Sequence, residues 1–187
     1  MCRRLERGVS RSGRLARGSL LLLALAAAGW SPAPVGTGPG PARGSVDGYP
    51  VPRFVSLRTD EVNFRAGPGF QYPVVWVYQR KGLPVEVIGE FDVWRHVVAP
   101  DGGSGWVHEA TIRARRGFIV TNSQAKLRTS PDAGAAVAAI LDSGVSGDLL
   151  RCKTGNDWCE VSAGHVTGYL QREDFWGAFA DETVGGS

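Results

Sequence analysis

"VNFRAGPGFQYPVVWVY", residues 62–78, places a Gly-Pro-Gly turn between two stretches with the composition of β-strands. The stretch "AKLRTSP", residues 125–131, repeats its apolar-Arg-small step and its proline turn 63 positions later. Three further pairs follow in the same order: "GLPVEV" (82–87) with "GVSGDL" (144–149), "DVWRHV" (92–97) with "GNDWCEV" (155–161), and "GWV" (105–107) with "GYL" (168–170). Because these landmarks keep their register, the sequence indicates a duplicated unit.

Both copies consist of short strands separated by turns. Gly67-Pro68-Gly69, Asp101-Gly102-Gly103 and Ser130-Pro131-Asp132 are typical turn sequences. No helical period is sustained after residue 52. Short strands at this spacing, in units this small, predict an all-β chain of two tandem small barrels, over residues 53–114 and 115–180.

Both units resemble bacterial SH3-like (SH3b) domains. The first matches in "VNFRAGPG", "WVYQRKGLPVEVIGEFDVWRHV" and "GSGWVHEATI", and the second in "KLRTSPDAGAAVAAIL", "GDLLRCKTGNDWCEV" and "GYLQREDFWG". The resemblance implies two partly opened SH3-like barrels in an exported protein linked to the bacterial cell wall. It also implies that the loop after the first long strand helps to wall a ligand groove.

The first 28 residues have the composition of a secretory signal peptide. Six arginines precede an apolar run over residues 20–28, and small residues follow it. The run is shorter than the roughly 20 apolar residues of a membrane span. We therefore expect cleavage near residue 28, export to the periplasm or elsewhere outside the cytoplasm, and only transient membrane contact through the signal peptide. The alternative is an uncleaved anchor.

Two further segments are expected to be disordered. Half of residues 29–52 are glycine or proline, so this segment cannot bury enough apolar surface to offset its ordering entropy and predicts a flexible, fairly extended arm. Residues 181–187 are expected to form a disordered tail.

The charge of the chain gives no indication of a nucleic-acid partner. Six of the 21 Lys and Arg residues, but only one of the 18 acids, lie in the leader. The remaining 15 basic and 17 acidic residues leave a mature chain near −2. The sequence pI of about 9.0 is therefore largely a property of the leader, and a nucleic-acid-binding function is not expected.

Cys152 and Cys159 flank the turn "KTGND" between two strands that we expect to pair as a hairpin. Directly opposed residues of antiparallel strands lie within disulfide range, and an exported compartment favours oxidation. We expect a structural disulfide that contributes about 2–3 kcal/mol in the chain-entropy model. Alignment of the copies places Ile88 and Arg95 at the matching positions of the first unit, so the bridge is predicted for the second unit alone.

Catalysis is not expected. If both cysteines are bridged, no thiol remains to form a nucleophile with His96, His108 or His165. The sequence carries no nucleophile-elbow or metal-binding signature, so we expect no catalytic residue, no metal site and no cofactor.

The first unit is crowded with aromatic residues, which support two interpretations. Val75 and Val77 are the better core candidates of their strand, which leaves Trp76 and Tyr78 exposed, lining a groove or covered by the other barrel. One interpretation makes the aromatics core or inter-barrel packing. The other makes Phe70, Tyr72, Trp76 and Trp94 a ligand groove, with Gly67, Pro68 and Gly69 shaping its loop. Arg128 repeats Arg65 where the glycines are absent, so Arg65 is expected to be structural.

These expectations combine into one functional hypothesis and one rival. The hypothesis is a non-catalytic binding protein of the cell envelope, whose first barrel recognises cell-wall peptide or an extended Pro/Gly-rich protein segment. The rival is a structural or adaptor protein that docks another envelope protein through its barrel surfaces, without a cell-wall ligand.

Overall fold

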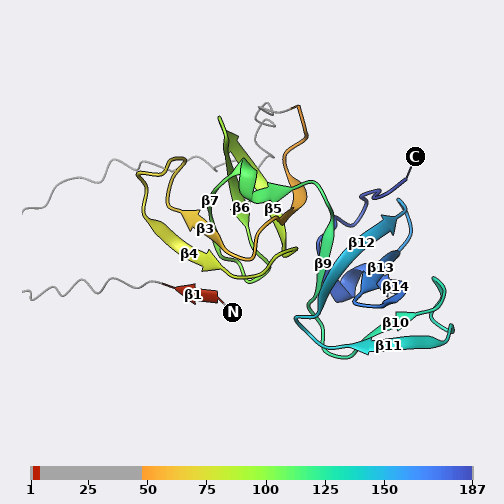
Figure 1. Ribbon diagram of the computed structural model, residues 1–187. Helices are drawn as coiled ribbons and strands as arrows, with labels where there is room; N and C mark the ends of the chain where they lie inside the picture. The colour runs from red at the N-terminus through yellow and green to blue at the C-terminus, as the bar shows by residue number, and fades with distance from the viewer. Residues whose placement is uncertain (1, 5–47, 187) are drawn as a thin grey trace, which may run out of the picture. The chain divides into compact units, whose positions relative to one another are not determined.

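The computed structural model describes residues 2–4 and 48–186 (Figure 1). Of the expected leader only residues 2–4 are described, and of the expected arm only residues 48–52; the rest of both lies outside the described residues. Within the described part of the chain, no helix has the length and apolarity that a membrane crossing requires.

The described residues form antiparallel strands and two short 3-10 helices. In chain order these elements are β1 (Cys2–Arg4), β2 (Arg53–Leu57), β3 (Val62–Arg65), β4 (Val74–Tyr78), β5 (Pro84–Phe91), β6 (Trp94–Val98), β7 (Ser104–His108), η1 (Glu109–Thr111), β8 (Ile112–Arg113), β9 (Gly117–Val120), β10 (Ala125–Arg128), β11 (Val137–Leu141), β12 (Ser146–Cys152), β13 (Trp158–Ala163), β14 (Val166–Gln171), η2 (Arg172–Asp174) and β15 (Phe175–Trp176).

The strands form two sheets, one for each predicted barrel. The first has the order β1-β4-β3-β7-β6-β5-β2-β8 and the second β11-β10-β14-β13-β12-β9-β15. Each sheet encloses its own apolar core, built around Phe64, Val85 and Val107 in the first barrel and around Phe118, Leu127 and Leu170 in the second. The expectation of an all-β chain with two tandem small barrels is confirmed.

The duplication extends to the backbone hydrogen bonds and irregularities. The Ala66 N–H donates to the Pro73 carbonyl at 2.9 Å, and the Thr129 N–H donates to the Ala136 carbonyl at 3.0 Å. Arg65 in β3 faces Trp106 in β7, just as its counterpart in β10 faces a tyrosine in β14. A β-bulge precedes the arginine in both copies. The two barrels therefore share one backbone plan at a spacing of 63 residues.

The expectation for Tyr78 is wrong. Tyr78 is only 4% exposed and lies in the first core, with its ring centroid 4.4 Å from that of Phe64. Its hydroxyl donates to Asp101 Oδ1 at 2.7 Å, so the polar end of the buried ring is satisfied. Val75 and Trp76 are both half-buried against the same core. The strand therefore does not divide cleanly into a valine face and an aromatic face, because the neighbouring bulge shifts its pairing.

Residues 181–186, assigned above to a disordered tail, instead pack against the second barrel. Val184 is buried and forms an isolated β-bridge with Cys152. Glu182 forms an ion pair with Arg116, and its backbone carbonyl accepts a hydrogen bond from Arg172. The polar composition of the tail concealed these contacts, since each depends on a partner outside the tail.

Phe54 of β2 contacts aromatic residues of the second barrel. Its ring centroid lies 4.7 Å from those of Trp176 and Phe179, and the Arg116 guanidinium lies 5.6 Å from it. These contacts bury Phe54, which is 5% exposed.

Candidate functional site

The first barrel carries a cluster of rings on the strands β6 and β7 and on the loop between β3 and β4. Phe70 lies 5.0 Å from Trp94 in an edge-on arrangement and 5.8 Å from His108 in a stacked one. Trp94 and His108 are 5.5 Å apart. Phe70 is 70% exposed, whereas Trp94 is 6% exposed. Trp94 therefore forms the floor of the cluster and Phe70 its outermost ring.

A second ring pair continues the same sheet face. The rings of His96 and Trp106 are stacked at 4.9 Å. Strand register pairs Trp94 with His108 and His96 with Trp106, so both pairs project from one side of β6 and β7. We call the set Phe70, Tyr72, Trp94, His96, Trp106 and His108 the aromatic face.

The loop that carries Phe70 and Tyr72 is held by Arg65. Its guanidinium donates to the Phe70 carbonyl at 3.2 Å and to the Tyr72 carbonyl at 2.8 Å. It also lies 5.5 Å from the centre of the Phe70 ring. Arg128 donates in the same way to the Ala135 carbonyl at 2.6 Å in the second barrel. The structural role expected for Arg65 is therefore supported by geometry.

Glycine is needed in the Gly-Pro-Gly turn because other side chains pack closely against it, and not because its backbone is left-handed. A Cβ at Gly67 would lie 2.6 Å from the Tyr72 ring, and a Cβ at Gly69 would lie 2.2 Å from the Gln71 side chain. Neither glycine has a positive φ. Serine is tolerated at the counterpart of Gly67 in the second barrel, where alanine replaces Tyr72. Gly67 is thus required by the tyrosine ring that covers it.

The predicted site residues lie in different places. Phe70 and Tyr72 are exposed on the loop, and Trp94 lies beneath Phe70. Trp76 is half-buried against the core of the barrel. Sequence reasoning missed three members of the face, His96, Trp106 and His108. Their signal was present in the two-residue spacing within "WRH" and "WVH" on neighbouring strands, which puts the outer residues of each triplet on one face.

The environment of His96 favours the neutral ring. Burial lowers the pKa of His96 below its ordinary value. A neutral imidazole can stack on the Trp106 indole without removing a charge from water.

The counterpart face of the second barrel has a different chemistry. Repeat spacing and strand register define the corresponding positions in the second barrel. Alanines stand there in place of Phe70 and Tyr72, Glu160 in place of His96, Tyr169 in place of Trp106 and Gln171 in place of His108. Of the rings, Trp94 alone keeps its type, as Trp158. The exposed aromatic cluster therefore belongs to the first barrel.

The disulfide between Cys152 and Cys159 is present, with an S–S distance of 2.04 Å and a Cα–Cα distance of 4.5 Å. The cysteines face each other across β12 and β13, as expected for the hairpin. In the first barrel, the residue that faces Arg95 is Glu90 and not Ile88. Ile88 was expected because the offset of Trp94 to Trp158 was applied to both strands, whereas the hairpin turn of the second barrel is two residues longer: Cys152 and Cys159 are seven positions apart, and Glu90 and Arg95 five.

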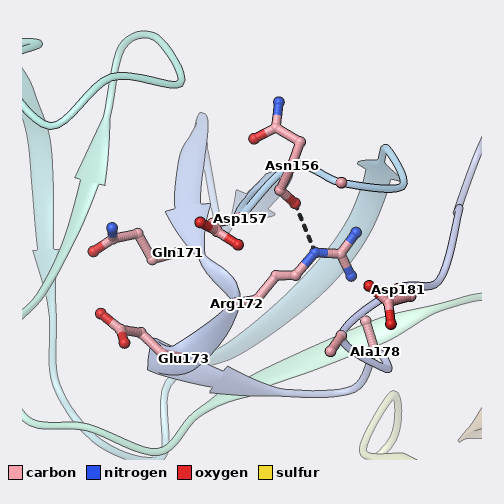
Figure 2. Close-up of a pocket in the computed structure, with 9 residues that line it drawn as sticks. Asn156, Asp157, Gln171, Arg172, Glu173, Ala178 and Asp181 are labelled. Carbon is pink, nitrogen blue, oxygen red and sulfur yellow. Dashed lines mark hydrogen bonds between the residues drawn. The ribbon is translucent and has the colours of Figure 1, made fainter.

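A cavity of about 560 Å³ in the second barrel is built around Arg172 (Figure 2). The guanidinium donates to four backbone carbonyls, those of Lys153, Asn156, Phe179 and Glu182. Asp157, Glu173 and Asp181 line the cavity as well. Two of these carbonyls belong to the β12–β13 turn and two to the C-terminal segment, so the Arg172 side chain joins the two segments. Its role is structural.

Comparisons with known proteins agree with the repeat. The sequence matches the family described as bacterial SH3 domain over residues 58–114 and 122–177. Two solved structures are similar in part, those of NlpC2 and NlpC1 from Trichomonas vaginalis, each with 13% identity and a TM-score of 0.31. The matches cover 68% and 72% of this chain and 49% and 48% of the respective structures, so the chain spans about half their length. No curated protein matches the sequence.

Proposed function

Since the chain belongs to the bacterial SH3 domain family, we propose that it is a non-catalytic, exported binding protein of the cell envelope. The aromatic face of its first barrel is the binding surface. Its ligand is cell-wall peptide or an extended Pro/Gly-rich protein segment. The second barrel has alanines at the positions of Phe70 and Tyr72 and therefore lacks this exposed cluster of rings.

One observation carries the proposal, namely the exposure of Phe70. The Phe70 ring is 70% exposed, its backbone is held by Arg65, and it contacts Trp94 edge-on and His108 in a stacked arrangement, so it is preorganised for contact. Exposed apolar rings that gather in one place mark interaction sites more often than rings that stand alone. Its counterpart in the second barrel is an alanine, so the repeat plan does not demand a ring here.

The chemistry of the face suits a chain with few large side chains. Flat rings bury a large contact area with little conformational entropy loss, and aromatic-lined surfaces bind extended peptides in this way. Glycine, alanine and proline let a peptide backbone approach such rings closely. Cell-wall peptides and Pro/Gly-rich segments share this property.

A binding role without catalysis is also supported by the side chains that could have served as nucleophile and base. Both cysteines of the second barrel are joined in a disulfide and offer no thiolate. His96 and His108 are each engaged with an aromatic ring.

Sedimentation with purified peptidoglycan tests the proposal. The protein should enter the pellet with the cell wall and be released by soluble stem peptide. Failure to sediment, together with recovery of a defined envelope protein in a complex that survives wall digestion, would favour the adaptor role instead.

A further inference from the structure

The second barrel contains a small pocket on the face that corresponds to the aromatic face of the first. Arg151, Glu160 and Tyr169 lie side by side across β12, β13 and β14, because register pairs Arg151 with Glu160 and Glu160 with Tyr169. Trp158 and Lys153 also line the pocket. The pocket has a volume of about 120 Å³. Two basic groups therefore border a pocket with aromatic walls.

Within the described part of the chain, no other group forms a hydrogen bond or an ion pair with the charged side chains of this pocket. There, neither the Arg151 guanidinium nor the Lys153 ammonium forms a hydrogen bond or an ion pair, and the Glu160 carboxylate also lacks one. Other arginines of this barrel behave differently, since Arg116 is paired with a carboxylate and Arg172 with carbonyls. Arg151 and Lys153 are exposed and available to a ligand.

The size of the pocket restricts the ligand. Sites for whole small molecules usually enclose about 300–1,000 Å³. A pocket of about 120 Å³ holds one small group, such as the last residue of a peptide. An arginine and a lysine bind a carboxylate or a phosphate of that size well. The Trp158 and Tyr169 rings beside them favour the carboxylate of a peptide end, which brings an apolar side chain with it.

We propose that this pocket binds the terminal carboxylate of a peptide. Arg151 and Lys153 donate to the carboxylate oxygens. Trp158 and Tyr169 pack against the small apolar side chain of the terminal residue, and Glu160 accepts an N–H of the peptide. The inference is independent of the aromatic face, because it concerns the other barrel and other residues.

The first barrel does not offer this chemistry at the equivalent place. Register puts Gly89, His96 and Trp106 where the second barrel has Arg151, Glu160 and Tyr169. Burial lowers the pKa of His96, so this row carries no cation to match Arg151. The duplication therefore supports two surfaces of different specificity, one aromatic and one for an anionic chain end.

Nuclear magnetic resonance of the isotope-labelled protein tests the inference. The probes are N-acetyl-Ala-Ala with a free carboxylate and the same dipeptide as its C-terminal amide. The acid should shift the indole N–H signal of Trp158 in a saturable way. The amide should bind at least about fivefold more weakly, since it lacks the charge that the two basic groups recognise.

Charge-neutralising variants complete the test. R151Q and K153Q should each weaken binding of the acid measurably, and together by about fivefold or more. R58Q and K126Q remove an exposed arginine and an exposed lysine outside the pocket, and should leave binding unchanged. Equal binding of acid and amide, equal losses in the control variants, or no shift at Trp158 would overturn the inference. Shifts confined to Trp94 and Trp106 would also overturn it, while supporting the proposed function of the first barrel.

Discussion

Arg95 and Glu90 form a buried ion pair at the two positions of the first barrel that Cys159 and Cys152 occupy in the second. Arg95 Nε lies 3.3 Å from Glu90 Oε1, and both side chains are 3% exposed. Arg53 reaches the same carboxylate oxygen at 2.6 Å, and Arg95 Nη2 lies 2.7 Å from Glu109 Oε2. The corresponding hairpins are thus cross-linked differently: an ion pair joins β5 to β6 in the first barrel, and a disulfide joins β12 to β13 in the second.

Arg95→Met should lower the free energy of unfolding by about 3–5 kcal/mol, because it leaves Glu90 buried without one of its partners. Chemical denaturation measures this loss. The double variant E90M/R95M should recover part of it, since the only carboxylate that then lacks Arg95 is that of Glu109, which is half exposed. Arg58→Met, at an exposed arginine, is the control. A loss below about 1 kcal/mol for Arg95→Met would show that the pair is not structural.

Cys152 and Cys159 should resist a thiol reagent in the folded, oxidised protein and react after reduction. Replacing both by alanine should lower the free energy of unfolding by about 1–3 kcal/mol and leave the fold intact, because Val161 and Leu170 still fill the core around them. Mass spectrometry of labelled protein checks the first statement and thermal melts check the second. Labelling of Cys152 or Cys159 in the untreated native protein, located by mass spectrometry, contradicts the disulfide.

The register of the hairpins illustrates what sequence could and could not predict. Four pairs of landmarks in the same order, among them Arg65 and Arg128 at a spacing of 63, predict the repeat, and the spacing of strands and turns predicts two all-β barrels. The partner of Arg95 was missed, because the β12–β13 turn is two residues longer than the β5–β6 turn, so one offset does not align both strands of the hairpin. The bulge itself is common to both copies, after Val87 in β5 and after Leu149 in β12, and does not distinguish them.

The candidate site was predictable only in part for a similar reason. Phe70 and Tyr72 lie on a loop whose turn chemistry is visible in the sequence, so their exposure could be anticipated. The contact of Tyr72 with Gly67 depends on three-dimensional packing. The burial of Tyr78 depends on its hydroxyl meeting Asp101, which is distant in sequence.

Gly67→Ala should lower the free energy of unfolding by about 1–3 kcal/mol, because the new methyl group would overlap the Tyr72 ring. In a protein that already carries Tyr72→Ala, the Gly67→Ala substitution should cost much less stability, because the ring is then absent. A double-mutant cycle by thermal unfolding measures this coupling. Gly89→Ala, whose Cβ would make an ordinary 3.6 Å contact, should change stability by less than about 1 kcal/mol. Additive effects of Gly67→Ala and Tyr72→Ala would contradict the proposed contact.

Acidification should destabilise the first barrel through His96. Burial lowers the pKa of His96 in the folded state, so the unfolded chain binds more protons below the ordinary histidine value of about 6.5. The free energy of unfolding should therefore fall as pH drops from about 6.5 through the lower folded pKa. His96→Gln should remove this part of the pH dependence. Chemical denaturation of both proteins at about pH 8 and about pH 5 measures it, as the difference in the free energy of unfolding between the two pH values. An identical dependence in the variant would contradict the prediction.

Retention on purified peptidoglycan by Phe70→Ala, measured beside its thermal unfolding, tests the central claim most directly. Phe70 is 70% exposed, so its removal should change stability by less than about 1 kcal/mol while weakening retention by about 2 kcal/mol or more, roughly thirtyfold. Ile140→Ala removes a 57% exposed apolar side chain from the second barrel and should retain full binding. Trp94→Ala is unsuitable as the probe, because truncating a buried tryptophan costs about 3–5 kcal/mol of stability. Undiminished retention of a folded Phe70→Ala protein, or an equal loss in Ile140→Ala, would contradict the assignment of the aromatic face.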